Sequence, residues 1–324
     1  MPQPTLSQVH VNRPLTNLSV AFVQEESNFI AGSVFPTVPV DKKSDDYFTY
    51  PRDQWFTDEM KKRAPGGESA GSGYNIQTDT YSADVWALHK DVPDQIRDNA
   101  DDPLNLDQDA TRFLTQKWLL RREIEWAANF FTTGIWTGSV GGGDITPVTK
   151  WDAASGDPVQ DIQIQMDSMG EKTGFRPNKL VVTPAVHRAL RNNEDIKDRI
   201  KYVMKVTVDD VTPALLASLI GVQEYHVARA TRNTAQEGAT RSMSYIMGSD
   251  QVGLFYSAPN PGLLIPTAGY TFAWTGFSGA SSAGNTISTF RMEHLKSDRV
   301  EIEAAWDQKR VASDLGVFFT DVLT

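Results

Sequence analysis

A long amphipathic helix is the clearest element that the hydrophobic pattern predicts, between Pro103 and Phe131. Asp102 and Pro103 suit its N-cap and its first turn, and at 1.5 Å per residue the helix would span roughly 43 Å. Trp118 and Trp126 lie partly off the apolar stripe, so the pattern predicts a spine helix in contact with two layers. The stripe repeats at spacings of three and four residues: Leu106, Ala110, Phe113, Leu114, Leu120, Ile124, Ala127 and Phe131.

An arm precedes this helix, in which two extended segments face each other across a polar loop. The outgoing segment begins near residue 45 and includes Trp55 and Phe56, and the returning segment runs from Tyr74 to Leu88. The loop between them, residues 57–73, is rich in glycine. An isolated two-stranded ribbon is only marginally stable in water, so we expect the arm to lie on another copy of the chain.

A mixed α/β region follows a glycine-rich loop at 137–156. The pattern predicts helices at 159–169, 184–192 and 213–219, and strands at 179–183, 224–227, 244–247 and 252–256, the last two paired across residues 248–250. Residues 270–287 suggest loops and short strands. Alternating strands at 287–295 and 300–306 and an apolar strand at 315–319 end the chain.

The first 44 residues predict an extended arm, because prolines interrupt them repeatedly and only residues 18–30 could form a short helix. Val34 to Val40 alternates apolar residues with prolines, which suits an edge strand or a polyproline-like segment. The regular apolar residues favour a terminus that is held by partners rather than a disordered one.

Composition excludes several classes of protein. The 324 residues have 40% hydrophobic and 22% charged side chains, which is typical of a globular protein. The absence of cysteine excludes disulfides and thiolate chemistry. The start lacks the basic and apolar regions of a secretory signal, and no apolar run is long enough to span a membrane. A net charge of −10 argues against general nucleic-acid binding.

One motif could indicate catalysis. Residues 67–71 read Gly-Glu-Ser-Ala-Gly, which matches the G-x-S-x-G elbow of serine hydrolases around Ser69. That chemistry requires a buried strand before the serine and a helix after it, whereas the flanking residues here are charged or glycine-rich. The pattern therefore favours a flexible loop, and a hydrolase that uses Ser69 remains the weaker alternative.

No metal, cofactor or catalytic residue is predicted. The five histidines are scattered without metal-site spacing, and no phosphate-binding glycine motif occurs. The basic tip at Lys61, Lys62 and Arg63 suits a solvated turn or pairing with carboxylates of a neighbouring subunit. Acidic residues close in sequence make it a poor phosphate site.

The order of these elements resembles that of the major capsid proteins of tailed double-stranded DNA bacteriophages, which have the HK97-like fold. Residues 176–186 resemble the strand-to-helix entry of that family's axial domain, 217–222 the helix before its next strand, and 311–322 its closing strand. The resemblance covers essentially the whole chain. It implies an α+β, HK97-like capsid fold with an N-terminal arm, an extended β-hairpin loop, a long spine helix, a central α/β axial domain and peripheral β-strands.

The resemblance also implies a division of the chain into five parts. These are the N-terminal arm (1–44), the extended loop (45–90), the peripheral domain with the spine helix (91–150), the axial domain (151–285) and a return to the peripheral domain (286–324). The residues that we expect at contacts between subunits are Trp55, Phe56, Lys61, Lys62, Arg63, Tyr74, Trp118 and Trp126.

The implied function is structural rather than enzymatic. Subunits of this family form pentamers and hexamers of an icosahedral shell around packaged DNA, in the virion after assembly in the host cytoplasm. The short N-terminal arm implies a separate scaffolding protein, a decoration protein is an optional partner, DNA is contacted only non-specifically, and no membrane is involved. An encapsulin-like compartment, which shares the fold and packages protein, is the main alternative.

Overall fold

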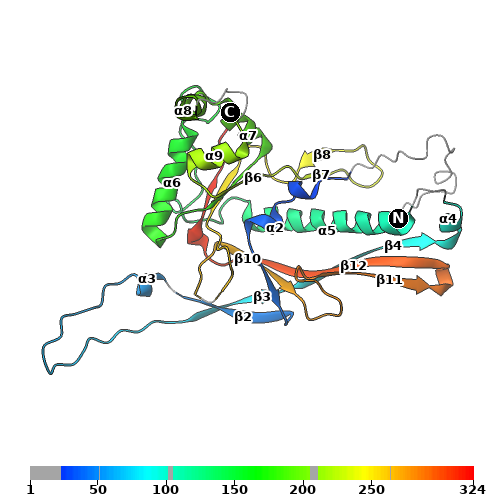
Figure 1. Ribbon diagram of the computed structural model, residues 1–324, viewed down its shortest axis with the longest axis horizontal. Coiled ribbons are helices and arrows are strands. Elements are labelled where there is room, and N and C mark those ends of the chain that lie inside the picture. The colour runs from blue at the N-terminus through cyan, green and yellow to red at the C-terminus, as the bar shows by residue number, and fades with distance from the viewer. Residues whose placement is uncertain (1–22, 51, 101–104, 205–210, 263) are drawn as a thin grey trace.

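The computed structural model describes residues 23–50, 52–100, 105–204, 211–262 and 264–324 (Figure 1). The N-terminal half contains η2 (Glu26–Asn28), α2 (Ala31–Val34), β1 (Thr37–Val40), β2 (Ser44–Thr49), α3 (Arg52–Trp55), β3 (Gln77–Ser82), β4 (Asp84–Pro93), α4 (Asp94–Asp98) and α5 (Leu106–Phe130). The middle contains α6 (Pro158–Thr173), β5 (Lys179–Val182), α7 (Pro184–Asn192), α8 (Glu194–Met204), α9 (Pro213–Ile220), β6 (Glu224–Val227), β7 (Thr231–Asn233) and β8 (Met243–Tyr245). The C-terminal part contains β9 (Val252–Phe255), β10 (Gly269–Trp274), β11 (Asn285–Met292), η4 (Glu293–Leu295), β12 (Ser297–Arg310), η5 (Ser313–Leu315) and β13 (Gly316–Phe319).

The predicted spine helix is α5, whose 25 residues span about 37 Å. Its N-cap is Asn105, whose side chain accepts a hydrogen bond from the Gln108 amide. The start expected at Asp102 and Pro103 lies outside the described residues. The helix packs on β12 and β4 and also contacts α2, so it touches two layers as predicted.

The peripheral sheet is built around β12, the longest strand. One side of β12 pairs with β11 and then with β10, and the other side pairs with β4. The predicted hairpin of the last long strands is confirmed as β11 and β12, although Ser297 and Asp298 belong to β12 rather than to the turn. Strand β1 lies in parallel on the edge of β10, which confirms the edge strand expected near Val40.

The axial sheet has the strand order β13-β9-β5-β6 and separates two hydrophobic cores. On one face, Leu180 and Leu254 pack with residues of α6, α7, α8 and α9. On the other face, Val181 and Phe255 pack with α2 and the C-terminal end of α5. The end of the spine helix is therefore fixed against the axial sheet.

The arm contains the predicted hairpin, in which β2 and β3 are antiparallel neighbours. Its base lies on the face of the peripheral sheet that is opposite α5. Tyr81 of β3 stacks on Phe272 with ring centroids 4.6 Å apart, and Phe272 is the register partner of Asp307. Alternate β12 residues such as Ile302 belong instead to the cluster under α5. Successive side chains of a strand point to opposite faces, so α5 and the arm flank the sheet.

Some sequence predictions were wrong. Residues 244–247 do not pair with 252–256, because β8 pairs with β7 while β9 lies buried between β13 and β5. A continuous apolar run such as β9 is typical of a strand that is buried on both faces. The helix suggested at 18–30 is absent from its described part, where only η2 forms before α2. Helix α8 was not predicted, whereas β10 is one of the short strands suggested for residues 270–287.

Candidate assembly surfaces

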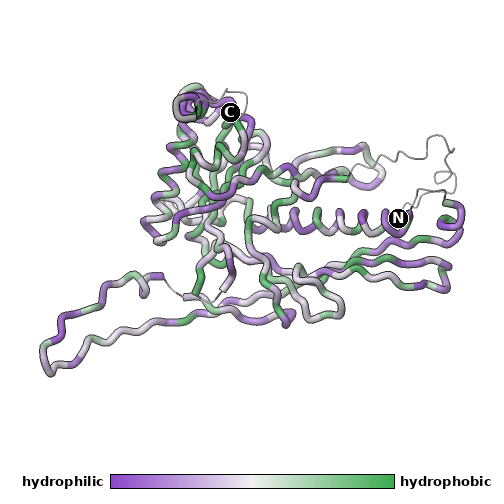
Figure 2. The backbone as a smooth tube through the Cα atoms, viewed as in Figure 1, coloured by the Kyte–Doolittle hydropathy of each residue, from purple (hydrophilic) through white to green (hydrophobic). Residues whose placement is uncertain are grey.

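The arm beyond the β2–β3 hairpin exposes large apolar side chains. Trp55, Phe56 and Tyr74 are each more than half exposed, and Met60 is 94% exposed. In Figure 1 this segment extends away from the body of the subunit, and Figure 2 shows mostly polar or near-neutral residues along its distal loop. Apolar surface of this kind marks a contact with another molecule when it is contiguous.

The base of this segment is ordered by a small aromatic cluster. The ring centroids of Trp55 and Tyr74 lie 5.4 Å apart, and Tyr50 lies within 6.2 Å of both. Arg52 forms an ion pair of 2.9 Å with Asp314 of the C-terminal region. The ring contacts hold the two sides of the arm together, and the ion pair ties the outgoing side to the body of the subunit. Residues 57–73 have no hydrophobic core of their own.

The basic tip is exposed at all three of its cations, Lys61, Lys62 and Arg63. Arg63 Nε donates a hydrogen bond to the Gly67 carbonyl oxygen at 2.5 Å. None of the three forms an ion pair with another residue in the described part of the subunit. Their charge is therefore available to a neighbouring molecule.

The two tryptophans predicted on α5 have different environments. Trp126 has no exposed surface and packs with Phe35, Phe130 and Phe131 at centroid distances of 5.8 to 6.1 Å. Its prediction as a contact between subunits was wrong, because the C-terminal turns of α5 are buried on more than one side. Trp118 is half-buried beside the cluster under α5.

The N-terminal arm is anchored on α5 by two buried charged residues. The Glu123 carboxylate accepts hydrogen bonds from the amides of Ile30 and Ala31, at 3.2 and 2.9 Å. The adjacent Arg122 donates to Thr37 Oγ1 at 2.9 Å. Between Ile30 and Thr37 the arm is thus held by its own subunit.

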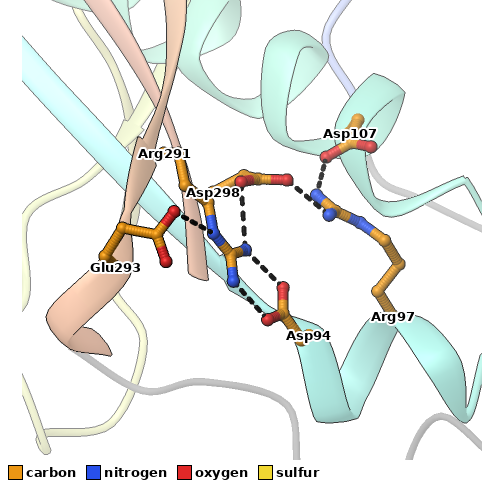
Figure 3. Close-up of polar contacts among 6 residues, drawn as sticks. All are labelled: Asp94, Arg97, Asp107, Arg291, Glu293 and Asp298. Atoms are coloured by element: carbon orange, nitrogen blue, oxygen red, sulfur yellow. Dashed lines mark hydrogen bonds and ion pairs between the residues drawn. The ribbon is translucent and has the colours of Figure 1, made fainter. Parts of the chain in front are cut away.

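The opposite end of α5 is fixed by an ion-pair network (Figure 3). Arg97 binds Asp107 and Asp298 at 2.8 and 2.5 Å. Arg291 binds Asp298 and also Asp94, at 3.2 and 2.5 Å. The network connects α4, the start of α5 and the end of the β11–β12 hairpin, and it lowers the pKa of the Asp298 carboxyl through its hydrogen bonds with the two arginines.

Comparisons with known proteins find one curated relative and several solved structures with a similar fold. The sequence matches no protein-family model. It is 27% identical over 236 residues to the major capsid protein of Burkholderia phage BcepMu, over 69% of this chain and 71% of that relative. A phage-related protein from Bordetella bronchiseptica has a TM-score of 0.70 at 21% identity, over 92% of this chain and 93% of that one.

Two further solved structures share the fold. The capsid protein of the cyanophage P-SCSP1u has a TM-score of 0.58 at 10% identity, over 95% of this chain and 91% of that one. The SrpI encapsulin from Synechococcus elongatus has a TM-score of 0.54 at 12% identity, over 96% of this chain and 94% of that one. The chain is a homologue of phage major capsid proteins with the HK97-like fold. The family and fold predicted from the sequence are confirmed.

Ser69 of this capsid protein homologue lacks the setting of a hydrolase nucleophile. It is exposed in an irregular segment, with no strand before it and no helix after it. Among the described residues, no group of three or more His, Asp or Glu side chains could hold a metal ion. No helix in the described ranges is long and apolar enough to cross a bilayer. The family relationship implies a structural role.

The sequence analysis of this capsid protein homologue missed Glu123. A charged residue within a helix that carries many charges is ordinarily exposed, so the residue type alone did not indicate that Glu123 is buried. Burial raises the pKa of the Glu123 carboxyl to about 7, although the amides of Ile30 and Ala31 and the charge of Arg122 oppose this shift. The side chain is therefore a titratable anchor for the N-terminal arm.

Replacing Glu123 by glutamine is expected to remove a specific dependence of stability on pH. Between about pH 4.5 and 7 the folded capsid protein homologue binds more protons at Glu123 than the unfolded chain does, so this contribution to the free energy of unfolding falls as the pH rises. The fall amounts to about 3 kcal/mol, at 1.36 kcal/mol for each unit of pKa shift. Urea unfolding of the natural chain and of the Glu123→Gln variant between pH 4.5 and 8 measures this fall. If the free energy of unfolding changed with pH by the same amount in both proteins, Glu123 would not be the titrating anchor.

Proposed function

We propose that this chain is the major subunit of a phage head, which assembles as pentamers and hexamers of an icosahedral shell around double-stranded DNA. The observation that carries the proposal is the arm, which exposes aromatic and basic side chains far from the core of a subunit with the HK97-like fold. The sequence identity of 27% to a phage major capsid protein supports the same function.

The arm of one copy lies over a neighbouring copy in this proposal. Trp55, Phe56 and Tyr74 provide the apolar contact, and the tip at Lys61, Lys62 and Arg63 binds carboxylates of the neighbour. Trp118 adds a partly exposed aromatic surface. Each contact is weak, but head-to-tail contacts close into a ring, in which every subunit binds two neighbouring subunits at once. Such simultaneous contacts raise the overall affinity.

The division of the chain into functional parts follows the elements. We assign residues 1–44 to the N-terminal arm, 45–90 to the extended loop, 91–150 and 286–324 to the peripheral domain, and 151–285 to the axial domain. The axial sheet and the helices that cover it support the last assignment.

Further partners follow from the same proposal. A separate scaffolding protein directs assembly in the host cytoplasm, and a decoration protein is an optional addition to the finished head. Contact with DNA is non-specific, which fits a net charge of −10. Nothing in the proposal requires a cofactor.

An encapsulin-like compartment is the second candidate, favoured by the likeness to the SrpI encapsulin. The contents of the particle separate the two. We would produce the chain together with the products of its neighbouring genes, purify the particles and treat them with nuclease. Nuclease-resistant double-stranded DNA is the expected content, whereas particles filled with a cargo protein and free of DNA would favour the compartment.

A further inference from the structure

A two-stranded hairpin extends from the axial domain beside α5 and exposes apolar side chains. It consists of β7 and β8, in which Thr231 is opposite Tyr245 and Asn233 is opposite Met243. Met243 and Tyr245 are two residues apart on β8, so they point to the same side of the hairpin. Their side chains are 62% and 49% exposed. The β7–β8 hairpin therefore presents a small apolar surface to its surroundings.

Polar contacts order this hairpin, although the hydrophobic clusters of the described subunit contain none of its residues. The side-chain oxygen of Asn233 accepts hydrogen bonds from the amides of Ala235 and Ser242, at 3.1 and 3.0 Å. At the base of the hairpin, the Gln24 side chain exchanges two hydrogen bonds with the backbone of Thr231, at 2.7 and 2.9 Å. Because an isolated hairpin is only marginally stable in water, we expect its exposed side to contact another molecule.

A groove on the exposed side of α6 is also partly apolar. Ile164, Asp167 and Glu171 follow one another at spacings of three and four residues, so they share one face of the helix. Ile162 and the other α6 residues of the axial core lie on the opposite face. Val140, from the loop before α6, lines the groove beside Ile164, and both side chains are largely exposed.

The groove and the hairpin lie on opposite sides of the axial domain. In Figure 1, α6 forms the side from which the arm extends, whereas the hairpin points the other way along α5. Phe56 of the arm lies beside Gly174, the C-cap of α6, so a copy that the arm covers also faces the groove. Two different surfaces on opposite sides of a subunit make head-to-tail contacts, which can close into a ring.

The two surfaces carry opposite charges. Helix α6 contains three carboxylates and one lysine, Lys172, which donates a hydrogen bond to a backbone carbonyl of the preceding loop. The hairpin contains two arginines and one glutamate. Asp167 approaches Arg176 to 3.4 Å, whereas Glu171 and Arg241 form no ion pair with any other residue in the described ranges. Charge complementarity of this kind favours correct pairing and register between partners.

We infer that the β7–β8 hairpin of one copy docks in the α6 groove of the next copy around a pentamer or hexamer. The apolar side of β8 covers Val140 and Ile164, and Arg241 pairs with Glu171. This inference rests on the proposed function and adds a contact that the arm does not make. Each subunit then binds its neighbour through two separate surfaces, which raises the overall affinity.

Paired cysteines test the contact, because the natural chain contains none. Shells of the full-length Ile164→Cys/Met243→Cys variant would be treated with a short bifunctional maleimide, which demands a less exact geometry than a disulfide. A contact between two different surfaces joins chains in series. After denaturation we therefore expect a ladder of linked chains that ends at the pentamer and the hexamer. Shells of either single-cysteine variant should yield dimers at most.

Two results would overturn the docking. One is an intact shell of the paired variant without linked chains. The other is a paired variant that yields dimers alone, because identical surfaces would then meet. If the unsubstituted chain forms no shells, the proposed function itself fails, so the two failures are distinguishable.

Charge reversal provides a second test that needs no cross-link. Glu171→Arg and Arg241→Glu should each lower the yield of shells, because each places like charges across the contact, and their combination should restore the yield. Glu194→Arg is the matched control, since Glu194 is an exposed carboxylate of α8 outside the groove, and Arg241→Glu should not raise its yield. Normal yields from both single variants, or a combined variant no better than either, would overturn the pairing.

Discussion

Deleting residues 57–73 and joining Phe56 to Tyr74 through two glycines is expected to leave the subunit folded and to abolish stable shells. The deleted loop contributes no residue to the hydrophobic clusters of the described subunit. Its two ends are already close, since the rings of Trp55 and Tyr74 lie 5.4 Å apart, so a short turn can close the arm. Circular dichroism and urea unfolding report on the fold, and electron microscopy reports on the shells.

The deletion separates the two roles that the arm could have. If the loop served the stability of its own subunit, the variant would unfold at a lower urea concentration than the natural chain. If the loop were a passive surface segment, shells would form in normal yield. Either result would contradict its role as a contact between subunits.

Trp126→Ala is expected to destabilise the isolated subunit by about 3–5 kcal/mol, the usual range when a fully buried tryptophan is truncated. The side chain has no exposed surface and contacts the rings of Phe35, Phe130 and Phe131. Its loss opens a cavity where the N-terminal arm, the spine helix and the axial sheet meet. The midpoint of urea unfolding measures the effect.

Trp55→Ala provides the matched control, because the same residue type is truncated where it is more than half exposed. It should change the free energy of unfolding of the subunit by less than about 1 kcal/mol and should reduce the yield of shells. A large loss of stability from Trp55→Ala, or none from Trp126→Ala, would contradict the roles assigned to the two tryptophans.

Local chemistry determined the elements that the sequence predicted well. Helix α7 begins at Pro184 and ends at Asn192 as expected, because proline at a first turn is a strong local signal. The β11–β12 hairpin was also predictable, since alternating strands joined by a short connection are local pairs. The pairing of β2 with β3 was predicted as well, although residues 50–76 separate the two strands. The family followed from the order of these elements.

Features that depend on distant contacts were not predictable. Trp126 lies off the apolar stripe of α5, yet it is buried because α2 and the axial sheet cover that side of the helix. Glu123 is an anchor only because Ile30 and Ala31 present their amides to it. The partner of β9 depends on the position of β13, more than sixty residues away in the chain.

The assignment of side chains to the two faces of the peripheral sheet shows the same limitation. The charges of Lys90 and Glu303 are visible in the sequence, but the face that each occupies depends on the register of β4 and β12. A shift of one residue in that register would exchange the two faces. The face that each charge occupies could therefore be recognised only from the structure.

Electron microscopy of the purified chain, alone and with a scaffolding protein supplied, is the most direct test of the central claim that the arm makes this subunit a building block of a shell. We expect closed particles with pentamers and hexamers, in which the arm of each subunit lies over a neighbour. A chain that stays strictly monomeric under both conditions would contradict the claim.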